Sequence, residues 1–228
     1  MGDLVLRFPQ RVVFGPDVVN RLGQIVSTHG DRCLILTESV LRQNGTIEHI
    51  ENILNRRSIS AIIHSDIGPG ATTSGLEKLI SVARASQARV IVAVGGMRVL
   101  AAARVVSVAA GSDLPLGDVL SGRATGPATT SYIEIPSSYR NHFMLQDQCV
   151  LTDGTTRHPV LVQLPEGTTK AVLVDPNLTL SMSPKYAAAA MMDTLLAAVE
   201  AYISNRSSFL SDTLLIEAIK HLGSALQG

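Results

Sequence analysis

The fold of this chain is decided by Val90-Ile91-Val92-Ala93-Val94-Gly95-Gly96-Met97-Arg98-Val99-Leu100. Its apolar, largely β-branched first half predicts a strand buried on both faces. Two glycines end that strand, and the Ala/Val-rich pattern after them predicts a helix over residues 99–110. A strand, a glycine turn and a helix together present free backbone N–H groups and the positive end of a helix dipole to a phosphate. The same glycines would equally serve tight packing of the strand against the helix, so both interpretations stay open.

The composition excludes several classes of partner. The chain has 228 residues, enough for one large or two smaller domains, and its 19 basic and 19 acidic residues cancel. We therefore expect neither nucleic acid nor an anionic membrane surface as partner. The N-terminus lacks the features of a secretion signal, and no apolar run reaches the ~18 residues that would cross a bilayer. We expect a soluble, cytoplasmic protein in which Cys33 and Cys149 are free thiols, although two cysteines could also pair.

Strands and helices alternate along the first two thirds of the chain. Strands are predicted at residues 4–8, 11–14, 32–36, 60–64, 90–94 and 132–135, and helices at residues 17–28, 47–55, 73–85 and 99–110. Asp17 is the expected N-cap or first-turn acid of the first helix. This alternation predicts an α/β fold with a doubly wound parallel sheet. Ligands of such sheets bind beyond the carboxyl ends of the strands, where Thr37, Glu38 and the two glycines would lie.

The second half of the chain changes in character. Residues 111–130 are rich in Gly, Ser, Asp, Pro and Thr and predict a loop. Extended runs at 149–152 and 160–164 predict a β-ribbon, and 171–174 a final strand. From Pro184 the pattern is helical, over 187–203 and 212–226. We therefore predict an α/β domain over residues 1–183 and an all-α region over residues 184–228.

Several phrases, in order along the chain, are similar to those of one family. They are Arg11-Val12-Val13-Phe14-Gly15, Ala93-Val94-Gly95-Gly96, Ile135-Pro136-Ser137-Ser138, Asp175-Pro176-Asn177-Leu178-Thr179 and Met192-Asp193-Thr194-Leu195. Together they resemble the iron-containing (group III) alcohol dehydrogenase superfamily, with its dehydroquinate synthase-like fold and its glycerol dehydrogenase relatives. Tyr139, directly after the two serines, resembles the maleylacetate reductase branch.

The resemblance implies a dinucleotide-binding domain, an all-helical domain, and a nicotinamide cofactor and a metal in the cleft between them. Family members are considerably longer, so the chain resembles the nucleotide domain with only the first helices of the second domain. The implied cofactor-binding residues are Thr37, Glu38, Gly95, Gly96, Met97, Arg98, Ser137 and Ser138. NAD or NADP would fit, and an acid at Glu38 favours NAD because it would repel a 2′-phosphate. An ordinary solvated loop acid would look the same.

The glycine turn departs from the family pattern Gly-Gly-Gly-Ser-x-x-Asp-x-x-Lys. Met97, Arg98, Ala101 and Arg104 stand at the third Gly, the Ser, the Asp and the Lys. A third glycine would allow a positive φ or a close approach to pyrophosphate, and Met97 is at a disadvantage for both. Arg98 either contacts a phosphate directly or is a solvated arginine at a helix start.

The metal site departs further. The family holds a divalent metal with one Asp and three His, the first two spaced Asp-x-x-x-His. Asp193 matches the Asp, but Ala197 stands at the first His, and one carboxylate cannot hold the metal alone. We therefore expect no metal. In the family the metal polarises the substrate oxygen during hydride transfer. Tyr139 and His142 are the candidate proton donors in its place, and His142 could also be a plain loop residue.

Three functions follow from these patterns. The first is a diverged nicotinamide-dependent oxidoreductase acting on an alcohol or carbonyl substrate. The second is a non-catalytic nucleotide-binding or assembly protein on the same scaffold. The third is a metal-independent lyase or isomerase that uses Arg140, Asn141 and His142 in the same cleft. The apolar faces of the two C-terminal helices also predict a homodimer or a higher oligomer.

Overall fold

The computed structural model describes residues 8–67, 72–124, 129–138, 141–206 and 208–227. Most of the strand predicted at residues 4–8 lies outside them. The chain divides into two compact units. The first comprises Met1–Ser137 and Asn141–Leu178, and the second comprises Ser138–Arg140 and Thr179–Gly228. In the described part of the chain, no helix combines the length and apolar character that crossing a bilayer requires.

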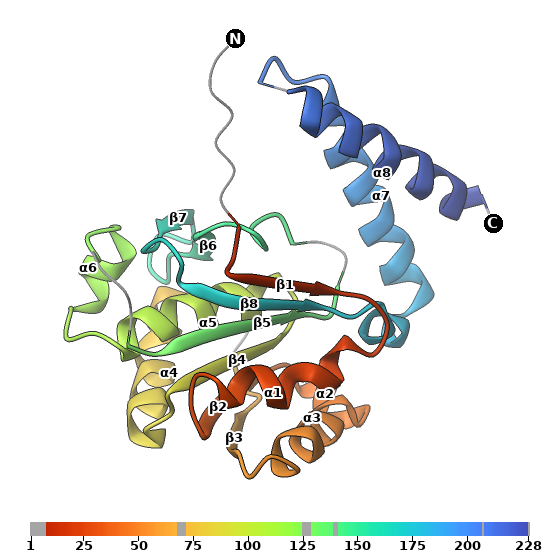
Figure 1. The fold of residues 1–228 in the computed structure, drawn as a ribbon. Helices are drawn as coiled ribbons and strands as arrows, with labels where there is room; N and C mark the ends of the chain where they lie inside the picture. Colours follow the sequence, from red (N-terminus) through yellow and green to blue (C-terminus); the bar gives the residue numbers. More distant parts are fainter. Residues whose placement is uncertain (1–7, 68–71, 125–128, 139–140, 207, 228) are drawn as a thin grey trace. The chain divides into compact units, whose positions relative to one another are not determined.

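The first unit is built on one six-stranded sheet, and every strand pair in it is parallel. Figure 1 shows the strands in the order β1-β8-β5-β4-β2-β3. The predicted parallel α/β fold is therefore confirmed. The strands are β1 (Arg11–Phe14), β2 (Arg32–Thr37), β3 (Ser60–His64), β4 (Val90–Gly95), β5 (Ser131–Pro136) and β8 (Thr169–Val174).

Strand β4 is buried along its whole length. Its side chains alternate between two apolar cores, with Ile91 and Ala93 in one and Val90, Val92 and Val94 in the other. Side chains of a strand point alternately to the two faces of its sheet, so both faces here are covered. This explains why the stretch is apolar without interruption rather than at every second position.

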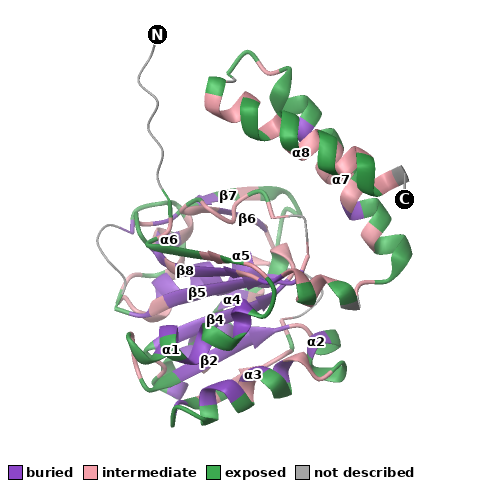
Figure 2. Cartoon of the chain, turned by 45° about the vertical axis from the view of Figure 1, so that its right-hand side comes forward, coloured by how far each residue is buried: buried purple, intermediate pink, exposed green. Residues whose placement is uncertain are grey.

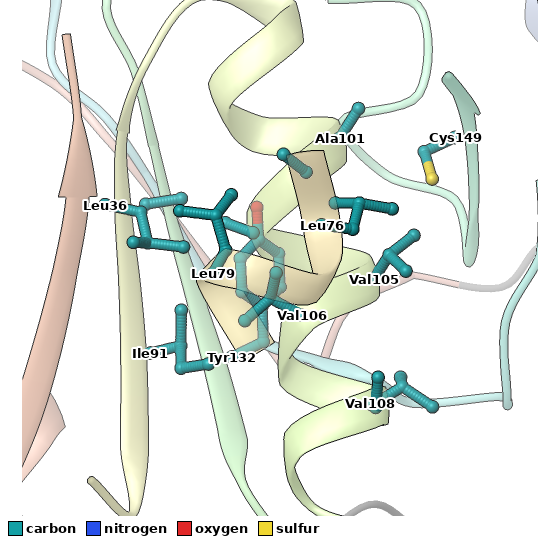
Figure 3. Packing of buried hydrophobic residues seen from close by; sticks show 14 of the residues in the cluster. Leu36, Leu76, Leu79, Ile91, Ala101, Val105, Val106, Val108, Tyr132 and Cys149 are labelled. Carbon is teal, nitrogen blue, oxygen red and sulfur yellow. The ribbon is translucent and has the colours of Figure 1, made fainter. Parts of the chain in front are cut away.

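Helices cover both faces of the sheet, and its central strands β2, β4, β5 and β8 are largely buried (Figure 2). Helices α4, α5 and α6 pack against one core. Figure 3 shows this core, with Leu76 and Leu79 of α4, Val105 and Val106 of α5 and Tyr132 of β5. The other core receives the helices that follow β1 and β2. The helices are η1 (Val18–Arg21), α1 (Leu22–Ser27), α2 (Ser39–Gln43), α3 (Thr46–Asn55), α4 (Thr73–Ser86), α5 (Met97–Ala110) and α6 (Leu116–Leu120).

Two short helices were not predicted. Residues 111–130 were expected to form only a loop, but Leu116–Leu120 form α6, which buries only Val119. Helix α2 begins at Ser39, directly after β2, and buries only Leu41. Helices of five residues carry too little apolar periodicity to be distinguished from a loop. The predicted β-ribbon is confirmed as the antiparallel pair β6 (Gln148–Thr152) and β7 (Pro159–Gln163).

Asp17 stands at the predicted N-cap position of the first helix, but its side chain does not provide the cap. Asp17 precedes η1 with a φ of 59°, and its side chain makes no capping hydrogen bond. The cap comes instead from Asp175, whose carboxylate accepts the N–H groups of Asp17 and Val19, each at 3.1 Å. Asp175 is 2% exposed and follows β8 directly. The carboxylate that accepts the free N–H groups at the start of this helix therefore belongs to a residue near the C-terminal end of the first unit in sequence.

The second unit consists of two helices, α7 (Pro184–Tyr202) and α8 (Phe209–Gln227), after the 3-10 helix η2 (Pro176–Ser181). Helix α7 begins with Pro184 after an N-cap serine, Ser183, which accepts the N–H of Tyr186. The two helices pack against each other, yet many of their large apolar side chains stay exposed. These include Leu196, Ile203, Phe209 and Leu214.

Gly95, the last residue of β4, is where the strand and α5 approach most closely. A Cβ added there would lie 2.9 Å from Val99 Cγ2 and 3.0 Å from Val99 Cβ. Gly96 follows with φ −79° and ψ 176°, an ordinary extended conformation. The close contact, rather than a positive φ, is what requires glycine at position 95. The tight-packing interpretation thus accounts for Gly95.

Replacing Gly95 by alanine is therefore expected to lower the free energy of unfolding by about 1–3 kcal/mol, because Val99 must move. In a Val99→Ala background the same replacement should cost less, since the branched side chain is gone. Urea unfolding of the four proteins of this cycle measures both costs. Gly117→Ala is the matched control: a Cβ at this exposed helical glycine meets nothing within 4 Å. Equal costs of Gly95→Ala in both backgrounds would contradict the packing argument.

Candidate functional site

The carboxyl ends of β2 and β4 lie side by side, because the strands pair in parallel with Thr37 opposite Val94. Glu38 follows β2, and Gly96 follows β4 as the N-cap of α5. Glu38 Oε1 accepts a hydrogen bond from the Gly96 backbone nitrogen at 3.4 Å. A carboxylate of the protein therefore occupies a backbone donor at the start of the helix, where an anionic ligand group would bind.

A cavity of about 330 Å³ opens at this edge of the sheet. Its lining is mostly polar and carries charges of both signs, from Glu38, Asp66 and Arg98. It is lined by Thr37, Glu38, Ser39, Ser65, Asp66, Ile67, Arg98 and Val99. Such a lining suits a ligand with hydroxyl and phosphate groups, since carboxylates accept from hydroxyls and a guanidinium binds phosphate.

Thr37 contributes a feature that the sequence pattern did not reveal. Its side chain is fully buried, and Thr37 Oγ1 has no hydrogen-bond partner among the described residues. Leaving a buried hydroxyl unpaired costs about 1–3 kcal/mol. The hydroxyl belongs to a residue that lines the cavity, so a polar ligand atom can supply the missing partner.

The eight predicted cofactor-binding residues are only partly brought together. Thr37, Glu38 and Arg98 line the cavity. Gly96 joins them through its hydrogen bond to Glu38. Gly95 and Met97 are their chain neighbours, and Met97 begins α5 with an ordinary helical backbone, so the absent third glycine leaves no strained φ.

The two serines of the predicted second cofactor segment lie at the end of the neighbouring strand β5. The backbone nitrogen of Ser137 donates to Gly95 O at 3.0 Å, and the Ser137 residue is buried. Ser138 is half-buried and is not among the residues that line the cavity. Ser137 is therefore fixed beside the glycine turn by its backbone, which does not use its hydroxyl.

Of the two candidate proton donors, His142 lies within the part of the chain that the structure describes. Tyr139 lies outside the described residues, as does Arg140. His142 is exposed and is not part of the cavity lining. The cysteines offer no nucleophile, because both are buried and free, and burial raises the pKa of each thiol to about 12.

The residues described do not fit a divalent-metal site of the kind that the resemblance implies. Asp193 lies on α7, and Ala197, four residues further along the same helix, has no ligand atom. Among the described residues, no group of three or more His, Cys, Asp or Glu side chains could hold a metal ion. Structural and catalytic sites for Zn²⁺ or Fe²⁺ use at least three protein ligands.

One buried charge pair was missed. Arg104 of α5 is 1% exposed and Glu134 of β5 is 0% exposed, and they form a short ion pair. Burial by itself lowers the pKa of Arg104, and the Glu134 carboxylate more than offsets it, so the pKa is raised. A signal was present in the sequence: one acid within the apolar strand around Ile133 and one base within the Ala/Val-rich helix.

Comparisons with known proteins agree with this architecture. Residues 9–176 match the sequence profile of the family described as "Iron-containing alcohol dehydrogenase". NADH-dependent butanol dehydrogenase B of Clostridium acetobutylicum is 24% identical, over 100% of this chain and 60% of that protein. Long-chain-alcohol dehydrogenase 1 of Geobacillus thermodenitrificans is 29% identical, over 85% of this chain and 49% of that protein.

Solved structures show the same fold. A 1,3-propanediol oxidoreductase superposes with a TM-score of 0.87 at 22% identity, covering 99% of this chain and 59% of that one. NADH-dependent butanol dehydrogenase A of Thermotoga maritima superposes with a TM-score of 0.87 at 18% identity, covering 100% of this chain and 57% of that one. The chain thus spans about half to three fifths of the length of these relatives. The matched residues 9–176 include all six strands of the parallel sheet. The chain therefore belongs to the iron-containing alcohol dehydrogenase family.

Proposed function

We propose that this chain binds NAD(H) at the cavity beside β2 and β4, and that it serves an oxidoreductase acting on alcohols or the corresponding carbonyl compounds. The observation that carries the proposal is the grouping of Thr37, Glu38 and Arg98 in the lining of one cavity, with Glu38 bonded to the Gly96 backbone nitrogen. Family membership and the names of relatives such as NADH-dependent butanol dehydrogenase B support it. A bound nicotinamide ring would supply or accept the hydride.

Each residue has a distinct part in binding. Arg98 pairs its guanidinium with a phosphate, and Thr37 donates its hydroxyl to a ligand oxygen. Glu38 accepts from ribose hydroxyls and disfavours a 2′-phosphate, so NAD(H) binds better than NADP(H). Glu38 also holds the Gly96 N–H in the ligand-free protein. A phosphate that takes this N–H must first displace the carboxylate.

A second candidate is a nucleotide-binding protein that does not catalyse oxidation. One observation favours it: Asp193 stands without a set of metal ligands in the described part of the chain. We therefore infer that the 228 residues bind no stoichiometric iron or zinc. The lyase or isomerase hypothesis is not supported in the same way, because the Asn141 amide is used internally, donating to Glu134 Oε1 at 2.6 Å.

Isothermal titration of the purified chain with NADH and NADPH tests the proposal, and we expect tighter binding of NADH. Arg98→Ala should weaken binding by about 1.5–3 kcal/mol, the contribution of one charge-assisted contact. The control is Arg56→Ala, which removes an exposed arginine after α3 that does not line the cavity. If neither nucleotide binds the unaltered chain, the proposal is wrong, and equal affinity in Arg98→Ala would remove Arg98 from the site.

Thr37→Val separates stability from binding. The valine has the shape of threonine and removes a hydroxyl that is buried without a partner, so the free energy of unfolding should rise by about 1 kcal/mol. Affinity for NADH should fall, because the ligand loses a hydrogen-bond donor. Urea unfolding and calorimetric titration measure the two effects. A variant that is less stable and binds NADH unchanged would show that the hydroxyl serves the fold alone.

Metal analysis of the chain, purified without chelators and after incubation with Fe²⁺ or Zn²⁺, tests the inference on metal. We expect no stoichiometric metal, because Ala197 offers no ligand beside Asp193. Ala197→His is the matched variant, since it restores the Asp-x-x-x-His spacing on one helix face. One tightly held metal ion per unaltered chain would contradict the inference. Turnover of butanol, followed by nicotinamide absorbance, then distinguishes the oxidoreductase from the second candidate.

A further inference from the structure

We propose that the buried pair Arg104–Glu134 positions the segment 141–148 and, with it, the edge of the nucleotide site at Ser137. The inference rests on the proposed function for what that site binds. It concerns positioning residues: neither Arg104 nor Glu134 is part of the cavity lining.

The pair lies in an apolar core, where charges are costly unless they are fully partnered. Arg104 Nη2 pairs with Glu134 Oε2, and the arginine also lies over the Tyr132 ring, with its central carbon 5.8 Å from the ring centroid. The Tyr132 hydroxyl is 3.0 Å from both Glu134 Oε2 and Leu100 O. Breaking one member of such a pair leaves the other charge buried without compensation. The pair is therefore one unit that links α5 to β5.

The unit extends from the core into the segment 141–148. Arg104 Nη1 donates to three backbone carbonyls, those of Phe143 at 2.8 Å, Gln146 at 2.9 Å and Gln148 at 2.5 Å. The Asn141 amide donates to Glu134 Oε1 at 2.6 Å. Residues 141–147 form turns and bends outside any helix or strand. The two buried side chains thus hold the segment at its first residue and at its last.

One positioning residue sits on α5, which lines the cavity through Arg98 and Val99, and the other sits on β5, the strand next to β4 in the sheet. Glu134 precedes Ser137 by three residues on the same strand end, and Ser137 donates its N–H to Gly95. Arg104 lies on the helix that begins at Met97, directly after the glycine turn. A change in how the segment is held therefore acts on α5, which lines the cavity, and on the end of β5, which is bonded to the glycine turn.

Arginine suits this position better than lysine would. Its planar guanidinium presents several N–H groups in a fixed arrangement, so it can bind a carboxylate through one nitrogen and carbonyls through another. A lysine has three N–H donors on a single nitrogen, so it lacks the two separate, coplanar nitrogens that here bind the carboxylate and the carbonyls. The arginine side chain can thus join α5, β5 and the segment 141–148, in addition to neutralising Glu134.

The double variant Arg104→Met/Glu134→Leu separates positioning from stability. Replacing a buried ion pair by apolar residues of similar volume is often neutral or stabilising, so the variant should fold with a Tm close to that of the unaltered chain. The segment nevertheless loses its anchors. We expect faster amide hydrogen exchange over residues 143–148, by about tenfold or more, and weaker binding of NADH. Asn141→Ala, which removes one anchor outside the core, should shift both readouts in the same direction and by less.

Leu54→Ala is the control, because it creates a cavity under α3 in the other core and should lower Tm without affecting the segment. Unchanged exchange over 143–148 in the double variant would overturn the proposal, and so would faster exchange with unchanged NADH affinity. The exchange measurement is made without ligand. If the unaltered chain binds no NADH, the proposed function fails, and exchange still decides whether the pair holds the segment.

Discussion

The contact between β4 and α5 is the constraint on which the rest of the first unit depends. The strand is buried on both faces, and the helix can lie against its end only because Gly95 leaves room for Val99. That approach sets the Gly96 N–H at the sheet edge, within reach of the Glu38 carboxylate. The position of the glycine turn, the start of α5 and the polar cavity beside them thus depend on one packing requirement.

Polar groups placed inside this apolar unit divide into two kinds. Asp175 and the Arg104–Glu134 pair make hydrogen bonds that join segments far apart in the sequence, although Arg104 Nε has no partner among the described residues. The Thr37 hydroxyl is the opposite case, buried at the sheet edge with no partner among the described residues. Satisfied groups specify how segments assemble, whereas an unsatisfied one beside a cavity is a place where a ligand can contribute.

Sequence reasoning succeeded where the information is local. Continuous β-branched runs such as 90–94 predicted buried parallel strands, and the rule for strand ends placed Thr37, Glu38 and the two glycines near one another. It failed where a partner is distant in the sequence. The cap of η1 comes from Asp175, and the buried Glu134 is explained by its ion pair with Arg104, 30 residues away. The two five-residue helices were missed because each buries a single side chain.

The capping of η1 by Asp175 also bears on the order of events during synthesis. Among the described residues, strand β1 pairs with β8 alone, and Asp175 lies 158 residues after Asp17, whose N–H it accepts. At about 5–20 residues per second, a ribosome needs on the order of ten to thirty seconds to make the residues between them. Throughout that time the first strand has no neighbour and the first helix has no cap. The nascent chain therefore exposes an unpaired strand edge, a natural substrate for chaperones, until its last strand emerges.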